Sequence, residues 1–163
     1  MNKYNYSYYK DTLFSDRRGF LWTSWDQNKN KSKLNFNHDK FSISKKNVLR
    51  GLHGDKKSWK LISCVYGKFF FVIVDYNKNS PNYLKYYSWV LSHNSNESIL
   101  VPPNFLNGHL CLSRECVFHY KLSYKGIYFD TNKQFSVKWN NKKIGIKWPI
   151  KKPILSTRDK NAE

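Results

Sequence analysis

Acidic residues are scarce in this sequence of 163 residues, because 11 Asp and Glu stand against 29 Lys and Arg, for a formal net charge of +18. No apolar run approaches the roughly 20 residues that a helix needs to cross a bilayer. The first residues, 1–5, carry no apolar signal-peptide stretch. Three cysteines without a pairing pattern also disfavour a disulfide-bonded secreted scaffold. We therefore expect a cytoplasmic protein with a single domain, residues 1–163, and no membrane span.

The positive charge has a compositional explanation. Of the basic residues 24 are Lys and 5 are Arg, while Asn occurs 18 times and Ala once, a profile that AT-rich coding sequence produces by itself. The lysines are scattered and form no block of five or six. Hydrophobic residues at 40% exclude a disordered basic tail. The composition favours a solvated basic surface, and it leaves open an anionic small molecule, a nucleic acid or an anionic membrane as partner.

Short apolar runs dominate the middle of the chain. Residues 61–66 and 69–75 flank Gly67 and Lys68, a pattern that predicts a β-hairpin. Further strands are predicted at 86–91, 98–101, 109–112, 116–123 and 135–139. No segment shows the 3.6-residue apolar spacing of a long helix. These features predict an all-β fold such as a jelly roll, with at most a short helix.

Several motifs of known chemistry are missing. The five histidines contain no His-x-His pair, which disfavours a metal site. There is no Gly-x-Ser-x-Gly elbow and no Walker or dinucleotide-binding glycine pattern. Cys64 and Cys111 lie in apolar segments and are expected in the core. The most informative local cluster runs from Arg50 to His53, where a fixed cation stands near a titratable imidazole, a combination suited to binding an anion beside a proton-transfer base.

Together with its flanking motifs, this cluster resembles the dTDP-4-dehydrorhamnose 3,5-epimerase family of cupin-type jelly rolls over nearly the whole chain. The matching pieces are Asp16-Arg17-Arg18-Gly19-Phe20, Ser42 to His53, Lys60-Leu61 with Gly67, Val74-Asp75 with Ser80-Pro81, Val101-Pro102 with Phe105 and Gly108, Tyr120, Ile146-Lys147-Trp148-Pro149 and Leu155-Ser156-Thr157-Arg158-Asp159. Their common order and spacing make a chance match improbable.

The resemblance implies epimerisation of a nucleotide-linked 4-keto sugar without metal or organic cofactor. In the family the histidine of the Arg-Gly-Leu-His motif is the general base, which here is His53. The resemblance gives Asp159 the role of orienting that imidazole and gives Lys60 the role of stabilising an enolate oxygen. It makes Tyr120 the acid that returns a proton on the opposite face. The alternatives are a structural His53–Asp159 pair, a solvated Lys60 and a core Tyr120.

The resemblance also implies a set of substrate-binding residues. Arg50 and Arg158 are expected at the substrate's phosphates or sugar oxygens. Arg18, with Phe20, is expected to reach the pocket from the neighbouring subunit of a homodimer. The aromatic N-terminal segment would then contribute to that dimer, as an edge strand or by exchange between subunits.

The sequence departs from the family at several pocket positions. Asn107 replaces the family's usual histidine, so this position cannot carry charge. His38-Asp39-Lys40 replaces Gln-x-Asn, and we expect His38 and Lys40 to contact substrate. Gly54-Asp55 replaces Tyr-Gln, which we interpret as room for a larger sugar. Tyr124 and Tyr128 are candidates for a Tyr-x-Pro motif that is not cleanly present.

These departures favour a GDP-4-keto-heptose of bacterial capsule synthesis as substrate, with inversion at C3 or at C3 and C5. The alternatives left open are a dTDP-4-keto-6-deoxyhexose 3,5-epimerase, a 3,4-ketoisomerase, and a basic β-barrel that binds nucleic acid through Lys and aromatic residues. The scarcity of clustered Arg counts against the last of these.

Overall fold

The computed structural model describes residues 6–28, 33–128 and 131–163. Within these residues nearly all regular structure is β. The strands are β1 (Ser7–Lys10), β2 (Phe14–Asp16), β3 (Gly19–Leu21), β4 (His38–Lys45), β5 (Leu49–Gly54), β6 (Trp59–Tyr66), β7 (Lys68–Asp75), β8 (Tyr86–Ser92), β9 (Glu97–Val101), β10 (Phe105–Cys111), β11 (Glu115–Ser123) and β12 (Phe135–Ser136). One 3-10 turn (Thr131–Lys133) and one short helix, α1 (Thr157–Lys160), complete the set.

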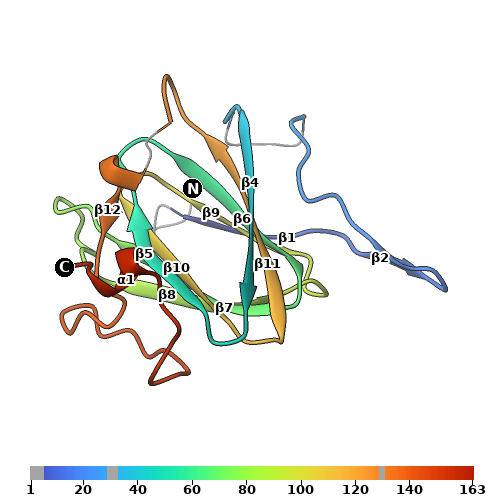
Figure 1. Ribbon diagram of the computed structural model, residues 1–163. Coiled ribbons are helices and arrows are strands. Elements are labelled where there is room, and N and C mark those ends of the chain that lie inside the picture. The colour runs from blue at the N-terminus through green and yellow to red at the C-terminus, as the bar shows by residue number, and fades with distance from the viewer. Residues whose placement is uncertain (1–5, 29–32, 129–130) are drawn as a thin grey trace.

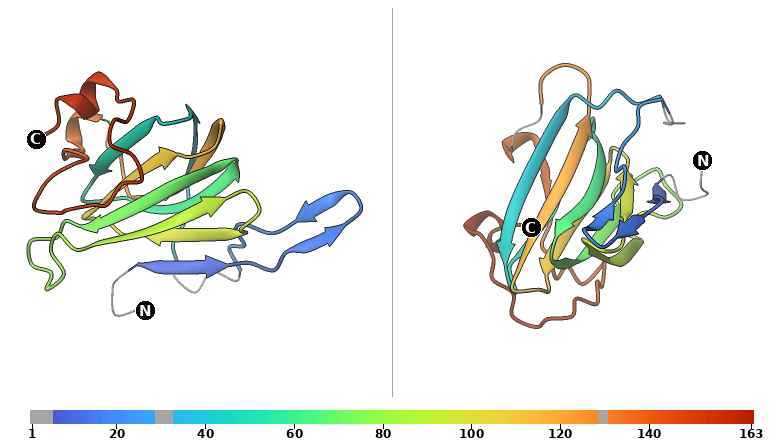
Figure 2. Two further views of the ribbon diagram at one scale, coloured as in Figure 1. Left: turned by 90° about the horizontal axis from the view of Figure 1, so that it is seen from below. Right: turned by 90° about the vertical axis from the view of Figure 1, so that its right-hand side faces the viewer.

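Two five-stranded antiparallel sheets face each other (Figures 1 and 2). The first, here the β6 sheet, has the order β1-β9-β6-β11-β4, and the second, the β5 sheet, has the order β12-β5-β10-β7-β8. The all-β class and the short helix are therefore confirmed, and the two-sheet architecture is that of the expected cupin-type jelly roll.

The apolar run of β7 is continuous because both faces of this strand are buried. Phe69, Phe71 and Ile73 belong to the core between the two sheets. Val72 and Val74 point the other way, into a second cluster that includes residues of the C-terminal segment. The C-terminal segment thus covers the outer face of the β5 sheet and brings α1 against β5. This is how the last residues of the chain reach the candidate site.

The hairpin predicted for residues 61–66 and 69–75 is wrong. β6 pairs with β9 and β11, whereas β7 pairs with β8 and β10, so the two strands lie in opposite sheets. Gly67 has a φ of +72°, and a Cβ there would overlap the carbonyl oxygen of Glu115. Two apolar runs around a glycine turn predict strands, but the pattern does not distinguish a hairpin in one sheet from a corner between two.

Most other predicted strands agree with the structure to within about two residues. The strand expected at 109–112 begins earlier, at Phe105, since its first half pairs with both β5 and β7. The strand expected at 135–139 is shorter: β12 covers Phe135 and Ser136, and Val137 continues the pairing through two backbone hydrogen bonds with Leu52. All three cysteines are free and buried, as expected for Cys64 and Cys111. In the part of the chain that the structure describes, no helix has the length and apolar character needed to traverse a membrane.

The hairpin β2–β3 extends away from the two sheets (Figure 2). Its apolar side chains are exposed: Phe14 is 65%, Phe20 53% and Leu21 71% accessible. A short two-stranded ribbon with this composition is marginally stable by itself in water. The edge strand expected of the N-terminal segment is confirmed by β1, which pairs with β9 at the end of the β6 sheet. Exchange of this segment between subunits stays a prediction, because a single chain does not test it.

Candidate active site

A histidine–carboxylate pair joins β5 to the C-terminal helix. The Nε2 atom of His53 lies 2.6 Å from Oδ1 of Asp159, whose side chain is only 3% exposed. Ser156 caps the helix, because its Oγ accepts a hydrogen bond from the Asp159 N–H and donates one to Asp159 Oδ2. Among the described residues the Nδ1 atom of His53 has no protein partner, and its side chain is 23% exposed. This nitrogen is therefore available to a substrate proton.

The electrostatics of Asp159 favour its ionised form. Burial works to raise the pKa of this carboxyl, but hydrogen bonds from His53, Ser156 and the Gly51 N–H, with the charge on His53, outweigh burial and lower the pKa. A carboxylate at one ring nitrogen fixes the tautomer and stabilises the imidazolium formed when the other nitrogen takes a proton. The pair has the geometry of an oriented general base.

Lys60, on β6, lies on the opposite sheet and is buried rather than solvated. Its Nζ is 3.3 Å from Asp55 Oδ2 and donates a hydrogen bond of 3.3 Å to Asn107 Oδ1. Asn107 is the β10 residue directly opposite His53 in the antiparallel register. Asn107 thus connects the base on one sheet with the ammonium on the other.

Tyr120, on β11, packs against the core between the sheets. Burial, with a smaller effect from Tyr128, raises its pKa to about 12, against the opposing charge of Arg50. A phenol with this pKa stays protonated throughout the physiological range and can act as a proton donor. Its packing against apolar side chains accounts for the burial.

Arg50, on β5, is held by β4 of the opposite sheet. Its Nε donates to Ser44 Oγ at 3.0 Å, and its Nη2 donates to the Ile43 carbonyl at 3.1 Å. His109 lies beside this pair, fully buried and stacked on Phe118 with ring centroids 4.2 Å apart. Burial, followed by the charges of Arg50 and His53, lowers the His109 pKa to about 3. His109 is therefore a neutral core residue, and it does not replace the histidine that the family has at position 107.

Aromatic side chains surround His38 and Lys40, the two residues of β4 that were expected to contact substrate. His38 Nδ1 lies 3.1 Å from the Tyr124 hydroxyl, and its ring meets that of Tyr128 at 5.0 Å. Lys40 Nζ lies 4.5 Å above the Tyr128 ring. Because the charge of Tyr128 acts on Tyr120, this cluster adjoins Tyr120. The structure thus brings His38 and Lys40 together with both tyrosines that had no clear motif match.

The remaining predicted residues fall into two groups. Arg158, on α1, donates to Gln134 Oε1 and lies near enough to Lys60 for its charge to lower the Lys60 pKa. Arg18 and Phe20 lie on the β2–β3 hairpin, where Arg18 is 85% exposed and pairs with Asp16. The structure therefore does not bring Arg18 or Phe20 into the pocket of their own chain.

The interpretation of Gly54 as room for a larger sugar is wrong. A Cβ at this position would overlap the carbonyl oxygen of Phe105 and approach the Cα of Leu106 to 3.2 Å. The glycine is needed because β10 crosses directly against β5 at this point. Its neighbour Asp55 was not predicted as a site residue, because its burial and its contact with Lys60 follow only from the packing of the strands.

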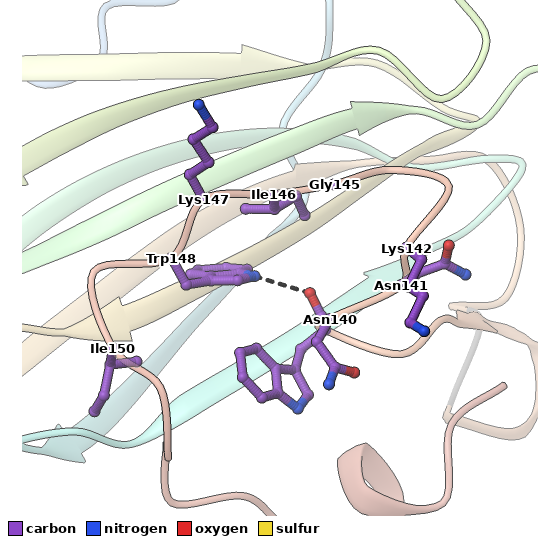
Figure 3. A pocket seen from close by; sticks show the side chains of 9 residues that line it. Asn140, Asn141, Lys142, Gly145, Ile146, Lys147, Trp148 and Ile150 are labelled. Carbon is purple, nitrogen blue, oxygen red and sulfur yellow. Dashed lines mark hydrogen bonds between the residues drawn. The ribbon is translucent and has the colours of Figure 1, made fainter.

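A second hollow lies on the C-terminal segment, outside the site just described (Figure 3). It has a volume of about 500 Å³ and is lined by Trp139 and Trp148, among others. Trp148 donates its Nε1 proton to the Trp139 carbonyl and packs against Phe70. Its aromatic rings are thus part of the cover of the β5 sheet. Among residues 6–28, 33–128 and 131–163, no three His, Cys, Asp or Glu side chains gather in a way that could hold a metal ion.

Known proteins are similar to this chain in both sequence and fold. The family described as dTDP-4-dehydrorhamnose 3,5-epimerase matches residues 5–163. A protein of that name from Salmonella typhimurium is 36% identical over 155 residues, which is 90% of this chain and 83% of the relative. A Shigella flexneri protein of the same name is 33% identical over 95% of this chain and 88% of its own length.

Solved structures of dTDP-sugar 3,5-epimerases have the same fold as this chain. The dTDP-4-dehydrorhamnose 3,5-epimerase of Bacillus anthracis superposes with a TM-score of 0.92 at 30% identity, covering 100% of this chain and 95% of that one. The Legionella pneumophila enzyme, solved with dTDP-4-keto-L-rhamnose, gives a TM-score of 0.89 at 29% identity, over 96% of this chain and 86% of that one. The match to the family covers nearly the whole length of this chain. The chain therefore belongs to the dTDP-4-dehydrorhamnose 3,5-epimerase family and is an epimerase of nucleotide-linked 4-keto sugars with a cupin-type fold.

Proposed function

We propose that this protein inverts C3 and C5 of a dTDP-linked 4-keto-6-deoxyhexose, using its own side chains and no metal or organic cofactor. The observation that carries the proposal is the His53–Asp159 pair, which lies opposite Asn107 on the neighbouring strand, where Asn107 binds the buried Lys60 ammonium of the other sheet. The two relatives described above carry the dTDP-sugar name, and the Legionella pneumophila enzyme was solved with dTDP-4-keto-L-rhamnose.

The GDP-4-keto-heptose of capsule synthesis has less support than the dTDP-sugar. The prediction of this substrate depended on positions at which the sequence differs from the family. One of these, Gly54, leaves no room for a larger sugar. The relatives named above act, by their names, on a dTDP-sugar rather than a GDP-sugar. The GDP-heptose is therefore the competing substrate in the experiment below, together with ketone migration by a 3,4-ketoisomerase.

The first chemical step is proton abstraction next to the ketone. The C4 carbonyl acidifies the C3 proton, and His53 Nδ1 takes that proton while the electron pair moves onto the C4 oxygen. Asp159 stabilises the imidazolium, and the Lys60 ammonium stabilises the enolate oxygen. Placing these groups in a dry pocket strengthens both interactions.

Inversion needs a proton from the opposite face. Tyr120 donates its phenolic proton to C3, the C4 carbonyl re-forms, and the configuration at C3 is inverted. Solvent then removes the proton from His53 and returns one to Tyr120, so no net proton is consumed. The same sequence at C5 completes the reaction.

The substrate's charged end needs cations. Arg50 and Arg158 are assigned to the diphosphate, and Arg50 is already oriented by Ser44. His38 and Lys40, within the tyrosine cluster, are assigned to the nucleotide or sugar. Asn107 offers hydrogen bonds but no charge. Arg18 and Phe20 are assigned to the neighbouring subunit's pocket in a homodimer, which would cover the exposed hairpin.

The test is incubation with dTDP-4-keto-6-deoxyglucose and with a GDP-4-keto-heptose in deuterium oxide, followed by NMR of the products. We expect deuterium at C3 and C5 of the dTDP-sugar with inversion, abolished in His53→Ala. Faster turnover of the GDP-heptose would overturn the dTDP assignment, and a carbonyl at C3 of the product would identify a ketoisomerase. Tight binding of single-stranded oligonucleotides at about 150 mM salt would instead support a nucleic-acid function.

A further inference from the structure

Asp55 follows β5 directly, and its two carboxylate oxygens have different partners. Oδ1 accepts hydrogen bonds from the backbone N–H groups of Lys57, at 2.9 Å, and Ser58, at 2.6 Å. Oδ2 lies 3.3 Å from the Lys60 ammonium, and the carboxylate has no exposed surface. The turn requires only an acceptor, which an amide or a hydroxyl also provides. The negative charge of Asp55, as distinct from its capacity to accept hydrogen bonds, therefore matters only for Lys60.

Lys60 has few groups that favour its charged form. Asn107, on β10, accepts a hydrogen bond from the Lys60 Nζ, and the residues opposite Lys60 on β9 and β11, Val101 and Leu122, are apolar. The charged groups that act on the ammonium are Asp55, from the β5–β6 connection, and Arg158, from α1. Burial lowers the Lys60 pKa, the charge of Arg158 lowers it further, and Asp55 opposes both. Among the described residues, Asp55 supplies the negative charge that raises the Lys60 pKa against these two effects.

Resting on the proposed epimerase function, we propose that Asp55 is a positioning residue of the reaction, which keeps the Lys60 ammonium charged and, with Asn107, directs it to the enolate oxygen. A neutral amine at Lys60 would offer the enolate only a weak hydrogen bond, whereas the ammonium offers a full positive charge. Asp55 acts through Lys60 alone and does not touch the substrate.

The experiment compares pH profiles of kcat/KM for solvent-deuterium exchange at C3. Asp55→Asn and Asp55→Ser keep an acceptor for the Lys57 and Ser58 N–H groups but lose the charge. We expect their alkaline limb to move down by at least one pH unit, so that at a pH above both limbs their activity is about tenfold below that of the wild type, while the acid limb stays in place. Asp55→Glu, which retains the charge, should return the alkaline limb to its wild-type position.

The matched control is Asp39→Asn. Asp39 pairs with Lys121, Nζ to Oδ2 at 2.8 Å, and with His119, Nε2 to Oδ1 at 2.9 Å, on the opposite, outer face of the same sheet. This variant loses one carboxylate–lysine pair and one negative charge, as Asp55→Asn does, but leaves the surroundings of Lys60 unchanged. We expect its pH profile to coincide with that of the wild type.

A second readout does not need substrate. In protein labelled with [¹⁵N]lysine, the Nζ signal of Lys60, assigned by its loss in Lys60→Met, should titrate at lower pH in both uncharged variants. An uncharged variant that unfolds cooperatively on heating yet keeps the wild-type alkaline limb and Lys60 titration would overturn the proposal. Absence of exchange on any 4-keto sugar in the wild type would refute the proposed function instead, and the Lys60 titration would still report on Asp55.

Discussion

The Nε2 atom of His53 lies 2.6 Å from Oδ1 of Asp159, so an imidazole on a central strand is bound by a carboxylate on the last helix of the chain. The C-terminal segment reaches this position by packing across the outer face of the β5 sheet. The packing of that segment and the orientation of the base are therefore coupled. Loss of either partner should affect the chemistry more than the fold.

Asp159→Asn should separate orientation from packing. The amide keeps the size of the carboxylate but lacks the charge that stabilises the imidazolium, and it can hold the wrong tautomer. We expect kcat to fall by about 10²–10⁴-fold with little change in KM. Steady-state kinetics on dTDP-4-keto-6-deoxyglucose measures both constants, and a fall of less than about fivefold would contradict a role for Asp159 in proton transfer.

Tyr120→Phe should uncouple exchange from inversion. Phenylalanine preserves the packing of Tyr120 against the core but removes the proton donor whose pKa burial raises to about 12. His53 can still take the C3 proton and return a deuteron on the same face. We expect deuterium in the unchanged substrate while formation of the epimer falls by about 10²-fold or more.

The control for this prediction is Tyr8→Phe. A hydrogen bond to Glu97 raises the pKa of Tyr8 to about 12 as well, but Tyr8 lies on β1 at the far edge of the β6 sheet. Epimer formation in this variant should equal that of the wild type. Equal inversion in Tyr120→Phe would show that another group donates the proton.

Gly54→Ala should destabilise the fold. The added Cβ would overlap the Phe105 carbonyl, so β5 and β10 must move apart. We expect the free energy of unfolding to fall by about 1–3 kcal/mol, as for overpacking in a core. Urea denaturation measures this loss. Gly126→Ala is a useful comparison, because its φ of +73° makes alanine strained while nothing lies within 4 Å of its Cβ. It should lose only about 1–2 kcal/mol.

Stability should decline in acid, partly because of two buried carboxylates. The pKa values of Asp55 and Asp159 are lowered in the folded protein, for although burial opposes ionisation, their hydrogen bonds and cationic neighbours outweigh it. Their stabilisation is present above the unfolded pKa of about 3.9 and is lost as the pH falls through the folded values. Urea titrations from pH 6 down to pH 2 should show a shallower decline for Asp55→Asn and Asp159→Asn than for the wild type.

The pKa of Asp11 is shifted in the opposite direction, so Asp11 serves as a comparison in the same urea titrations. Burial raises its pKa, so its ionisation disfavours the folded state as the pH rises. Asp11→Asn should therefore not show the shallower acid decline. If all three substitutions behaved alike, general charge repulsion in this basic protein would explain the pH dependence better than the individual carboxylates.

The proposed homodimer makes a prediction about subunit mixing. If Arg18 completes the neighbouring pocket, Arg18→Ala and His53→Ala are each inactive alone, but a mixed dimer contains one intact site. Refolding the two together in equal amounts should restore about a quarter of wild-type activity. No recovery, with mixed dimers demonstrated by mass spectrometry, would place Arg18 outside the reaction.

The exposed hairpin should control association. Leu21→Ser removes an apolar side chain that is 71% exposed, and Ile127→Ser removes one that is 85% exposed in a loop. We expect Leu21→Ser to shift sedimentation towards the monomer and Ile127→Ser to leave it unchanged. Equal sedimentation of all three proteins would exclude the hairpin from the interface.

The sequence by itself determined the all-β class, the short helix, most strand positions and the family. Alternating and continuous apolar runs depend on neighbouring residues, and the motifs around His53, Lys60, Tyr120 and Asp159 are local in the chain. These local motifs carry the family resemblance, and it is that resemblance which assigns the proposed proton-transfer residues.

The tertiary structure alone decided which segments meet. A periodic pattern specifies which side of a strand is apolar but not which strand pairs with it, so the placement of β6 and β7 in opposite sheets could not be predicted. The Asp55–Lys60 pair and the close approach of Gly54 to Phe105 depend on distances of a few ångströms between different strands. Such distances follow from the packing of the whole core, which no local segment encodes.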